Sequence, residues 1–286
     1  MQPTEQALVI DCDGRKLVGI AHLPQSAASR GVVIVVGGPQ YRVGSHRQFV
    51  LLARALAAGG TPVLRFDYRG MGDADGPPVE FRSTAPDIRA AVDKLQTVAP
   101  AVREVVLWGL CDAASAILMY VREDARISGV VLANPWVRSE AGIARAYLQH
   151  YYLGRLLSAD WWRGLFAGHV RIGSSLADLG RKMLAALGTR APTESGDANP
   201  RDSLPFQQAM LGGIQAYSGQ VLLIISGKDL TAAEFVDLAQ GSRQWRRALL
   251  RRGVSRSDLA QADHTFSRRE WRDDVARITT QWLRTW

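Results

Sequence analysis

The chain contains Val105-Val-Leu-Trp-Gly-Leu-Cys-Asp-Ala-Ala114, an apolar run that leads straight into a stretch of small residues. The apolar half predicts a short strand buried on both faces, as in a parallel sheet. Gly109 and Ala113 are small enough for a tight strand-to-helix turn, and this turn projects Cys111, which stands between them. The stretch therefore predicts an α/β fold that presents a cysteine at the end of a central strand.

Strands and helices are expected to alternate on both sides of this stretch. A hairpin around Asp13-Gly14 comes first, since this dipeptide favours a two-residue turn. The predicted strands then span residues 31–36, 62–67, 104–108, 129–133, 220–226 and 257–260, and the predicted helices span 49–58, 83–98, 113–122, 232–250 and 271–286. Alternation at this spacing predicts right-handed crossovers and a mostly parallel sheet flanked by helices.

The alternation stops between residues 137 and 215, where aromatic-rich, helix-like segments occur without a clear strand. An insertion between two strands of such a sheet lies over their carboxyl ends, where lids form. We therefore expect a first part of the core at residues 1–136, a helical cap insertion at 137–215 and a second part of the core at 216–286. The aromatic side chains of the cap are expected to line an apolar pocket above Cys111.

Two further strand ends carry residues that suit a cysteine nucleophile. Asp229 follows the predicted strand 220–226, and His264 lies in the loop between the last strand and the last helix. Taken alone, Asp229 is explained equally well as a turn aspartate. A lone loop histidine such as His264 is more often a surface residue than a base. The order nucleophile, acid, histidine is that of α/β-hydrolases, so together they predict the α/β-hydrolase fold and a triad of Cys111, Asp229 and His264.

The backbone around the nucleophile is expected to form an oxyanion hole. The Asp112 N–H follows the nucleophile at the start of a helix, and the helix N-terminus also favours the thiolate form of Cys111. A second donor is expected from the glycine-rich loop Gly37-Gly-Pro-Gln40, which follows the first parallel strand. Pro39 has no N–H, which leaves Gly38 or Gln40 as that donor.

Substrate contacts are expected from four residues: Tyr41 and His46 near the glycine-rich loop, and Tyr151 and Trp161 in the insertion. For His46 the sequence favours a surface or helix-start position over a substrate contact. The loop over residues 67–73 is interpreted as structural, since its glycines suit a sharp bend.

Chain length indicates the number of domains, and the cysteine and histidine content and the net charge indicate which ligands and partners to expect. A chain of 286 residues suits one α/β domain with an insertion. The two cysteines, Cys12 and Cys111, and the five scattered histidines show no metal-ligand spacing, so we expect no disulfide, metal or cofactor. The net charge of +8 comes without a zinc-finger spacing or an RNA-recognition signature, so a nucleic-acid partner is not expected.

Hydropathy gives the expected location. The sequence lacks the roughly 18 uninterrupted apolar residues of a membrane-spanning helix, and its first residues lack the order of a signal peptide. We therefore predict a cytoplasmic protein without a membrane span. The basic, aromatic insertion would suit peripheral contact with an anionic membrane. The pattern indicates no particular oligomeric state.

Several long motifs resemble one family. They are Gly37-Gly-Pro-Gln-Tyr-Arg-Val-Gly-Ser-His-Arg-Gln-Phe49, Phe66-Asp-Tyr-Arg-Gly-Met-Gly-Asp73, Trp108-Gly-Leu-Cys-Asp-Ala-Ala-Ser115 and Asn134-Pro-Trp-Val-Arg138. They are similar to the family called exosortase A system-associated hydrolase 1, over most of the chain. The resemblance implies the α/β-hydrolase fold and a genomic setting of exopolysaccharide production and protein sorting in Gram-negative bacteria. It implies no particular substrate.

The predicted reaction is the hydrolysis or transfer of an acyl group from a small or lipid-linked substrate. His264, held by Asp229, would take the Cys111 proton or pair with its thiolate, which attacks an ester or thioester to give an acyl-cysteine. Because a thioester passes its acyl group readily to other acceptors, an acyltransferase is an alternative to a hydrolase, as is lactone chemistry of the dienelactone hydrolase kind. A non-catalytic protein that binds an acyl chain or a partner is the alternative from another class.

Overall fold

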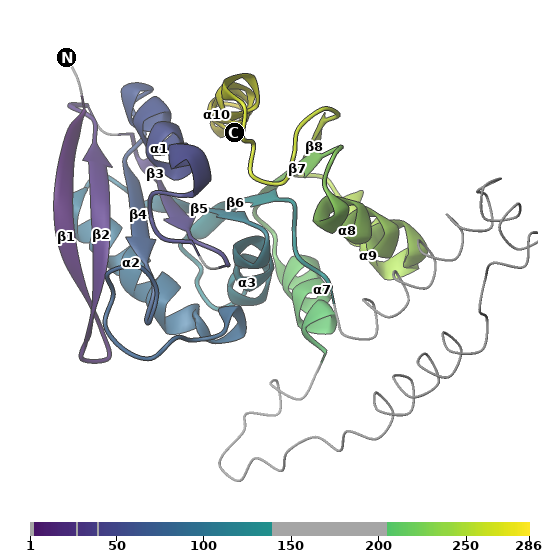
Figure 1. Ribbon diagram of the computed structural model, residues 1–286, viewed down its shortest axis with the longest axis horizontal. Coiled ribbons are helices and arrows are strands. Elements are labelled where there is room, and N and C mark those ends of the chain that lie inside the picture. Colours follow the sequence, from purple (N-terminus) through teal and green to yellow (C-terminus); the bar gives the residue numbers. More distant parts are fainter. Residues whose placement is uncertain (1–2, 27, 39, 139–204) are drawn as a thin grey trace, which may run out of the picture. The chain divides into compact units, whose positions relative to one another are not determined.

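One mostly parallel sheet of eight strands runs through the residues that the computed structural model describes, 3–26, 28–38, 40–138 and 205–286 (Figure 1). The strand order is β1-β2-β4-β3-β5-β6-β7-β8, and only β2 runs against its neighbours. The strands are β1 (Thr4–Cys12), β2 (Arg15–Leu23), β3 (Arg30–Val35), β4 (Val63–Asp67), β5 (Glu104–Leu110), β6 (Ile127–Ala133), β7 (Gln220–Ser226) and β8 (Val254–Leu259). The predicted α/β class is confirmed.

Helices cover both faces of the sheet, because alternate residues of each central strand point to opposite sides. On one side Trp108 of β5 joins a cluster with α1 (Gln48–Ala58) and α10 (Arg269–Leu283), and its ring meets that of Phe49 edge to face at 5.8 Å. On the other side Leu107 joins a second cluster. Its helices are α2 (Ala85–Val98), α3 (Asp112–Tyr120), α7 (Phe206–Ala216), α8 (Leu230–Gly241) and α9 (Arg243–Leu249).

The chain crosses from one side of β3 to the other, and this places the loops that matter for function. From β3 it passes through α1 to β4 on one flank, then through α2 to β5 on the opposite flank. Val35 at the end of β3 therefore lies beside Gly109 near the end of β5. In open α/β sheets, ligands bind at such a switch point, at the carboxyl ends of the strands.

The hairpin predicted at Asp13-Gly14 is confirmed. Both residues have positive φ angles, 50° and 76°, as a two-residue turn between twisted strands requires. The turn joins β1 to β2, and Cys12 at the end of β1 is buried.

The single helix predicted over residues 232–250 is wrong. Ser242 is extended, with φ −110° and ψ 124°, and it separates α8 from α9. Its hydroxyl accepts a hydrogen bond from the Trp245 N–H at 3.4 Å, which is the N-cap role that serine favours. The last strand also begins three residues earlier than predicted, at Val254.

Helix α7 lies within the range expected for the cap, yet it packs on α3 and buries Met210 and Ile214 in the core. A Cβ at Gly213 would lie 1.7 Å from the Leu118 carbonyl oxygen, so a glycine is required for this close approach. By internal contacts the chain divides into Met1–Val137 with Leu204–Trp286, and Arg138–Ser203. The second part of the core therefore starts before residue 216, while residues 139–204, on which the expected cap depends, lie outside the described residues.

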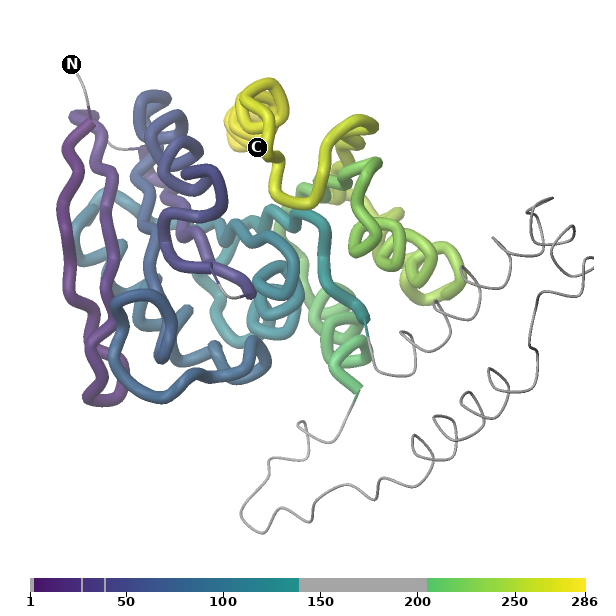
Figure 2. The backbone as a smooth tube through the Cα atoms, in the orientation of Figure 1, coloured from purple at the N-terminus to yellow at the C-terminus, as the bar shows by residue number. Residues whose placement is uncertain are grey.

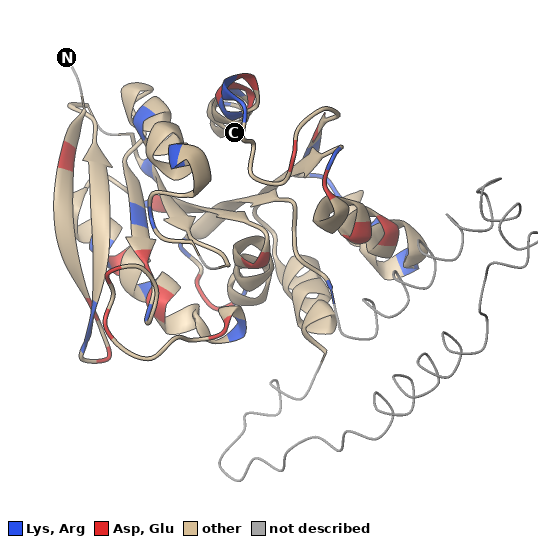
Figure 3. Ribbon diagram, in the orientation of Figure 1, with Lys and Arg blue, Asp and Glu red and all other residues tan. Residues whose placement is uncertain are grey.

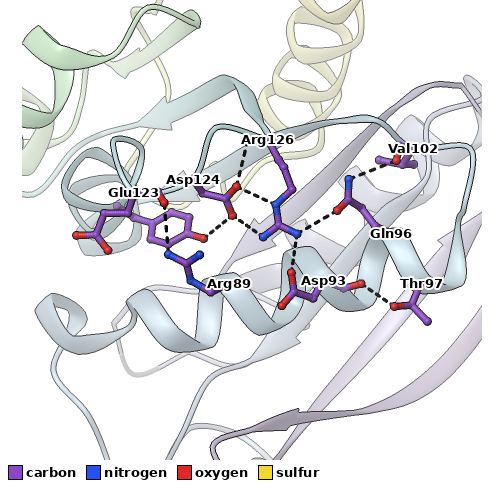
Figure 4. Close-up of polar contacts among 9 residues, drawn as sticks. Arg89, Asp93, Gln96, Thr97, Val102, Glu123, Asp124 and Arg126 are labelled. Atoms are coloured by element: carbon purple, nitrogen blue, oxygen red, sulfur yellow. Dashed lines mark hydrogen bonds and ion pairs between the residues drawn. The ribbon is translucent and has the colours of Figure 1, made fainter.

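A polar network fixes the edge of the sheet at the amino ends of the parallel strands (Figure 4). Arg126, just before β6, binds both oxygens of Asp124 at 2.6 and 2.8 Å and reaches Asp93 of α2 at 2.5 Å. Burial raises the pKa of Asp124, but the hydrogen bonds from Arg126 and Tyr120 outweigh it and hold the pKa at about 2. This network ties α2 to the loop before β6, at the edge opposite the carboxyl ends of the strands.

Basic and acidic residues are interspersed along the described helices and loops (Figure 3). Within the described ranges no helix is long and apolar enough to cross a membrane.

Candidate active site

Cys111 occupies a strained turn between β5 and α3, with φ 63° and ψ −126°. A non-glycine residue in such a conformation costs on the order of 1–3 kcal/mol and is typical of functional sites. Gly109 makes the turn possible, because a Cβ there would lie 2.7 Å from Ile117 Cδ1 and 2.8 Å from the Ala113 carbonyl carbon. The Cys111 N–H donates to the Ala133 carbonyl oxygen at 2.9 Å, which fixes the turn to the end of β6.

Asp229 and His264 lie in direct contact, with His264 Nδ1 2.7 Å from Asp229 Oδ2. Asp229 is also the N-cap of α8, and its carboxylate accepts from the N–H groups of Thr231 at 3.0 Å and Ala232 at 3.2 Å. Its side chain is 6% exposed. Three donors therefore hold the carboxylate in a single orientation, aimed at the imidazole.

His264 bridges Asp229 and Cys111. The hydrogen bonds to Asp229 and then to Cys111 raise its pKa to about 10, against the opposing effect of burial. With Nδ1 on Asp229, Nε2 is the nitrogen left for the sulfur. His264 therefore carries a proton at neutral pH, and this proton is available to a leaving group.

Asn134, which follows β6, holds the histidine loop and was not among the predicted site residues. Its buried side chain donates to Ser226 Oγ at 2.9 Å and to the His264 carbonyl oxygen at 3.2 Å, and it accepts from the Ser226 N–H at 2.8 Å. Ser226 in turn donates to the Asp263 carbonyl oxygen at 3.0 Å. The loop from β8 to α10 dips toward the carboxyl ends of β6 and β7, where these contacts form (Figure 2).

Replacing Asn134 with alanine is expected to lower the free energy of unfolding by about 2–3 kcal/mol, because it leaves buried polar groups unpaired. The histidine loop should also loosen, so alkylation of Cys111 should slow. Urea denaturation and timed iodoacetamide labelling measure the two effects. Ser226→Ala, which removes one hydroxyl, serves as the milder comparison. An Asn134→Ala protein that matches the parent in both measurements would contradict this role.

Two of the residues predicted for the oxyanion hole, Gly38 and Asp112, are in direct contact, so one donor is already engaged. The Gly38 N–H donates to Asp112 Oδ2 at 2.9 Å. Gln40 uses its side-chain oxygen to accept from the Ser45 N–H at 3.3 Å, a contact that closes the loop after β3.

The predicted substrate contacts are only partly within the described residues. Tyr41 is 46% exposed and faces the Arg42 guanidinium, 5.9 Å from its ring centroid. His46 lies in the 3-10 helix η1 (Ser45–Arg47), and its carbonyl oxygen accepts a hydrogen bond from Arg272 Nη1 at 2.9 Å. Tyr151 and Trp161 lie outside the described residues.

The loop after β4 has the structural role that its sequence suggested. The buried Asp67 carboxylate binds the backbone N–H and the guanidinium of Arg42, and it accepts from the Asp73 N–H at 3.1 Å. Arg42 also pairs with Asp73 at 2.7 Å. These contacts join the loops after β3 and β4, so they fix the glycine-rich segment, whose Gly38 N–H reaches Asp112.

Iodoacetamide is expected to modify Cys111 at least about 100-fold faster than Cys12. Cys111 is partly exposed and lies beside a protonated His264, whereas burial and then the charge of Asp87 raise the pKa of Cys12 to about 11. Timed labelling at pH 8 with peptide mapping measures both rates. Cys12→Ala should keep the fast phase and Cys111→Ala should lose it. Equal or faster modification of Cys12 would count against the assignment of the turn.

The family model described as "Serine aminopeptidase, S33" matches residues 27–193, more than half of the chain. The chain belongs to this family of α/β-hydrolases. The family description names a serine, whereas the turn after β5 presents Cys111 in this chain. Within the described residues no group of His, Cys, Asp and Glu is arranged to hold a metal ion.

Among known proteins, human Protein ABHD12B is 31% identical over 116 residues, which is 38% of this chain and 31% of the human protein. The chain thus matches about a third of the length of that relative. The structure of the Pyrococcus furiosus esterase Pf2001 superposes with a TM-score of 0.65 at 15% identity, covering 99% of this chain and 93% of the esterase. Ferulic acid-bound Est1E from Butyrivibrio proteoclasticus superposes with a TM-score of 0.61 at 14% identity, covering 96% and 97%. At these identities the likeness shows the α/β-hydrolase fold.

Proposed function

We propose that the protein is a hydrolase that uses Cys111 as its nucleophile and acts on an ester or thioester through an acyl-cysteine intermediate. One observation carries the proposal: a strained turn presents Cys111 to His264, whose other nitrogen is 2.7 Å from a capped, buried Asp229. A raised His264 pKa suits a protonated imidazole that gives its proton to the leaving group.

The proposed steps balance as follows. The Cys111 thiolate attacks the carbonyl carbon, and the carbonyl oxygen becomes an oxyanion. The intermediate then expels an alkoxide or thiolate, which takes the proton from His264, and an acyl-cysteine remains. Neutral His264 next removes a proton from water, whose oxygen attacks the thioester and releases a carboxylic acid. Cys111 departs as thiolate, and His264 is again protonated.

We propose the substrate class, the genomic setting and the location from the sequence and from chemistry. A small or lipid-linked acyl substrate fits the aromatic-rich insertion that the sequence places between β6 and α7, and a setting in exopolysaccharide and exosortase systems follows from the motif resemblance. Two structural relatives are the esterase Pf2001 and Est1E with ferulic acid bound, which supports an acyl substrate. A cytoplasmic location is proposed on the same sequence grounds.

The decisive experiment is intact-mass spectrometry of the protein after short exposure to a panel of acyl thioesters, aryl esters and aminoacyl amides. We expect one acyl group per chain, mapped to Cys111, from at least one thioester or ester. Cys12→Ala is the matched control and should acylate normally, while Cys111→Ala should not. Absence of any adduct and of any turnover across the panel would favour a non-catalytic acyl- or partner-binding protein.

The same acyl-enzyme distinguishes hydrolysis from transfer. An acyl-cysteine is activated toward amines, thiols and alcohols as well as water, so these acceptors and a sugar are added while the decay of the adduct and the product mass are followed. A new acylated acceptor would make the protein an acyltransferase. Decay at one rate to the free acid with every acceptor would leave simple hydrolysis.

A further inference from the structure

The side chain of Asp112 folds back onto the backbone beside the nucleophile. Its Oδ2 accepts the Gly38 N–H at 2.9 Å, and the N–H groups of Ala113 and of Asp112 itself also face the carboxyl group. The Asp112 and Gly38 N–H groups come from the residue after the nucleophile and from the loop after β3. These are the two positions from which α/β-hydrolases donate to the oxyanion.

The neighbouring backbone leaves room for this carboxyl group. A Cβ at Gly37 would lie 2.2 Å from Asp112 Oδ1, so any larger residue would exclude the side chain from its position. Oδ1 itself is buried and has no hydrogen-bond partner among the described residues. Only part of the carboxyl group's hydrogen-bonding capacity is therefore met where it lies.

A carboxylate in this place opposes the proposed chemistry in two ways. It uses donors that would otherwise stabilise the oxyanion, and its own charge would repel the negative charge that develops on the carbonyl oxygen. Preorganised donors of this kind are usually worth a factor of about 100 or more in rate, so their occupation has a large effect.

We propose that the Asp112 carboxyl group occupies the oxyanion hole of the resting protein and must leave it before Cys111 can be acylated. The inference rests on the proposed function, because an oxyanion forms only if Cys111 attacks an acyl group. Asp112 thus inhibits acylation in the resting protein, and a substrate relieves this inhibition by displacing the side chain.

The groups around Asp112 make its release feasible. Burial raises its pKa, the three N–H groups and the charge of His264 lower it, and the net direction is upward. Tyr68 is close enough for the Asp112 charge to act with burial in raising the pKa of the phenol to about 12. A carboxyl group that burial disfavours as an anion, and one of whose oxygens lacks a partner, gives up its position more easily than a fully paired carboxylate.

The test compares the rate of acyl-enzyme formation from S-phenyl thioacetate in the parent protein, Asp112→Ala and Asp112→Asn. Thiophenol release is followed by stopped flow. Iodoacetamide alkylation of Cys111, which forms no oxyanion, is measured in parallel as the control for thiolate reactivity. We expect Asp112→Ala to acylate at least tenfold faster than the parent after division by its alkylation rate. Asp112→Asn, which keeps the volume but removes the charge, should lie between the two.

The possible results separate this inference from the proposed function. If Asp112→Ala acylates no faster than the parent, or slower, while alkylation continues, inhibition by Asp112 is refuted. The carboxyl group then supports catalysis or stabilises the fold. If Cys111 is alkylated but not acylated in every variant, the proposed function is refuted, and inhibition by Asp112 is refuted with it. Should Asp112→Ala not fold, as judged by its melting temperature, Asp112→Asn decides by the same comparison.

Discussion

Replacing Cys111 with serine is expected to slow acyl transfer from a thioester by about 100-fold or more, although serine is the residue that the family description names. Because His264 is protonated at neutral pH, it suits a thiolate and imidazolium pair and is poorly placed to deprotonate a hydroxyl. The Cys111→Ala protein should lose about 10⁴-fold or more, since the covalent route disappears. Stopped-flow release of thiophenol measures all three proteins.

Cys12→Ala is the control for the loss of a thiol elsewhere and should retain the parent rate. Circular dichroism confirms that each variant is folded. A Cys111→Ala protein with turnover comparable to that of the parent would refute the mechanism.

The second large effect is expected at the base and its acid. His264→Ala should be as damaging as Cys111→Ala, because no other described group is hydrogen-bonded to both Asp229 and Cys111. Asp229→Asn should cost less, because the acid of a triad contributes less than its nucleophile or base, and the imidazole stays in place although it loses its anionic partner. Without that carboxylate the His264 pKa falls from about 10, so the alkaline limb of the pH–rate profile should move to lower pH.

The N-cap role of Asp229 provides a matched control for this series. Asparagine caps helices as well as aspartate does, so Asp229→Asn should keep the stability of α8, whereas Asp229→Ala should lose about 1 kcal/mol more. An alkaline limb that stays in place in Asp229→Asn would show that Asp229 does not set the His264 pKa.

The sequence was sufficient to predict features that depend on neighbouring residues and on chain order. Gly109 and Ala113 indicated the tight turn at Cys111, and the structure explains Gly109 by its approach to α3. Asp229 and His264 were predicted from their positions after strands. Parallel strands bring their carboxyl ends to one edge, so chain order sufficed to place them there.

What could not be predicted depends on which strands lie side by side and on how single side chains turn. Asn134 acts because β6 pairs with β7, which brings Ser226 and the His264 loop within its reach. The motif drew attention to the Asp112 N–H, whereas it gave no sign that the Asp112 carboxylate accepts the Gly38 N–H. The break at Ser242 had a local signal, because Gly241-Ser242 suits the end of one helix and the cap of the next.

The backbone conformation at Cys111 lowers the thermal stability of the fold, while it presents the thiol for the proposed reaction. Glycine adopts a φ of 63° without a steric penalty, so Cys111→Gly should relieve part of the strain and, after the entropy cost of glycine in the unfolded chain, stabilise the fold by about 1 kcal/mol. A library of variants screened only for survival at high temperature would therefore enrich glycine at this position. Selection for durability alone would thus discard the thiol.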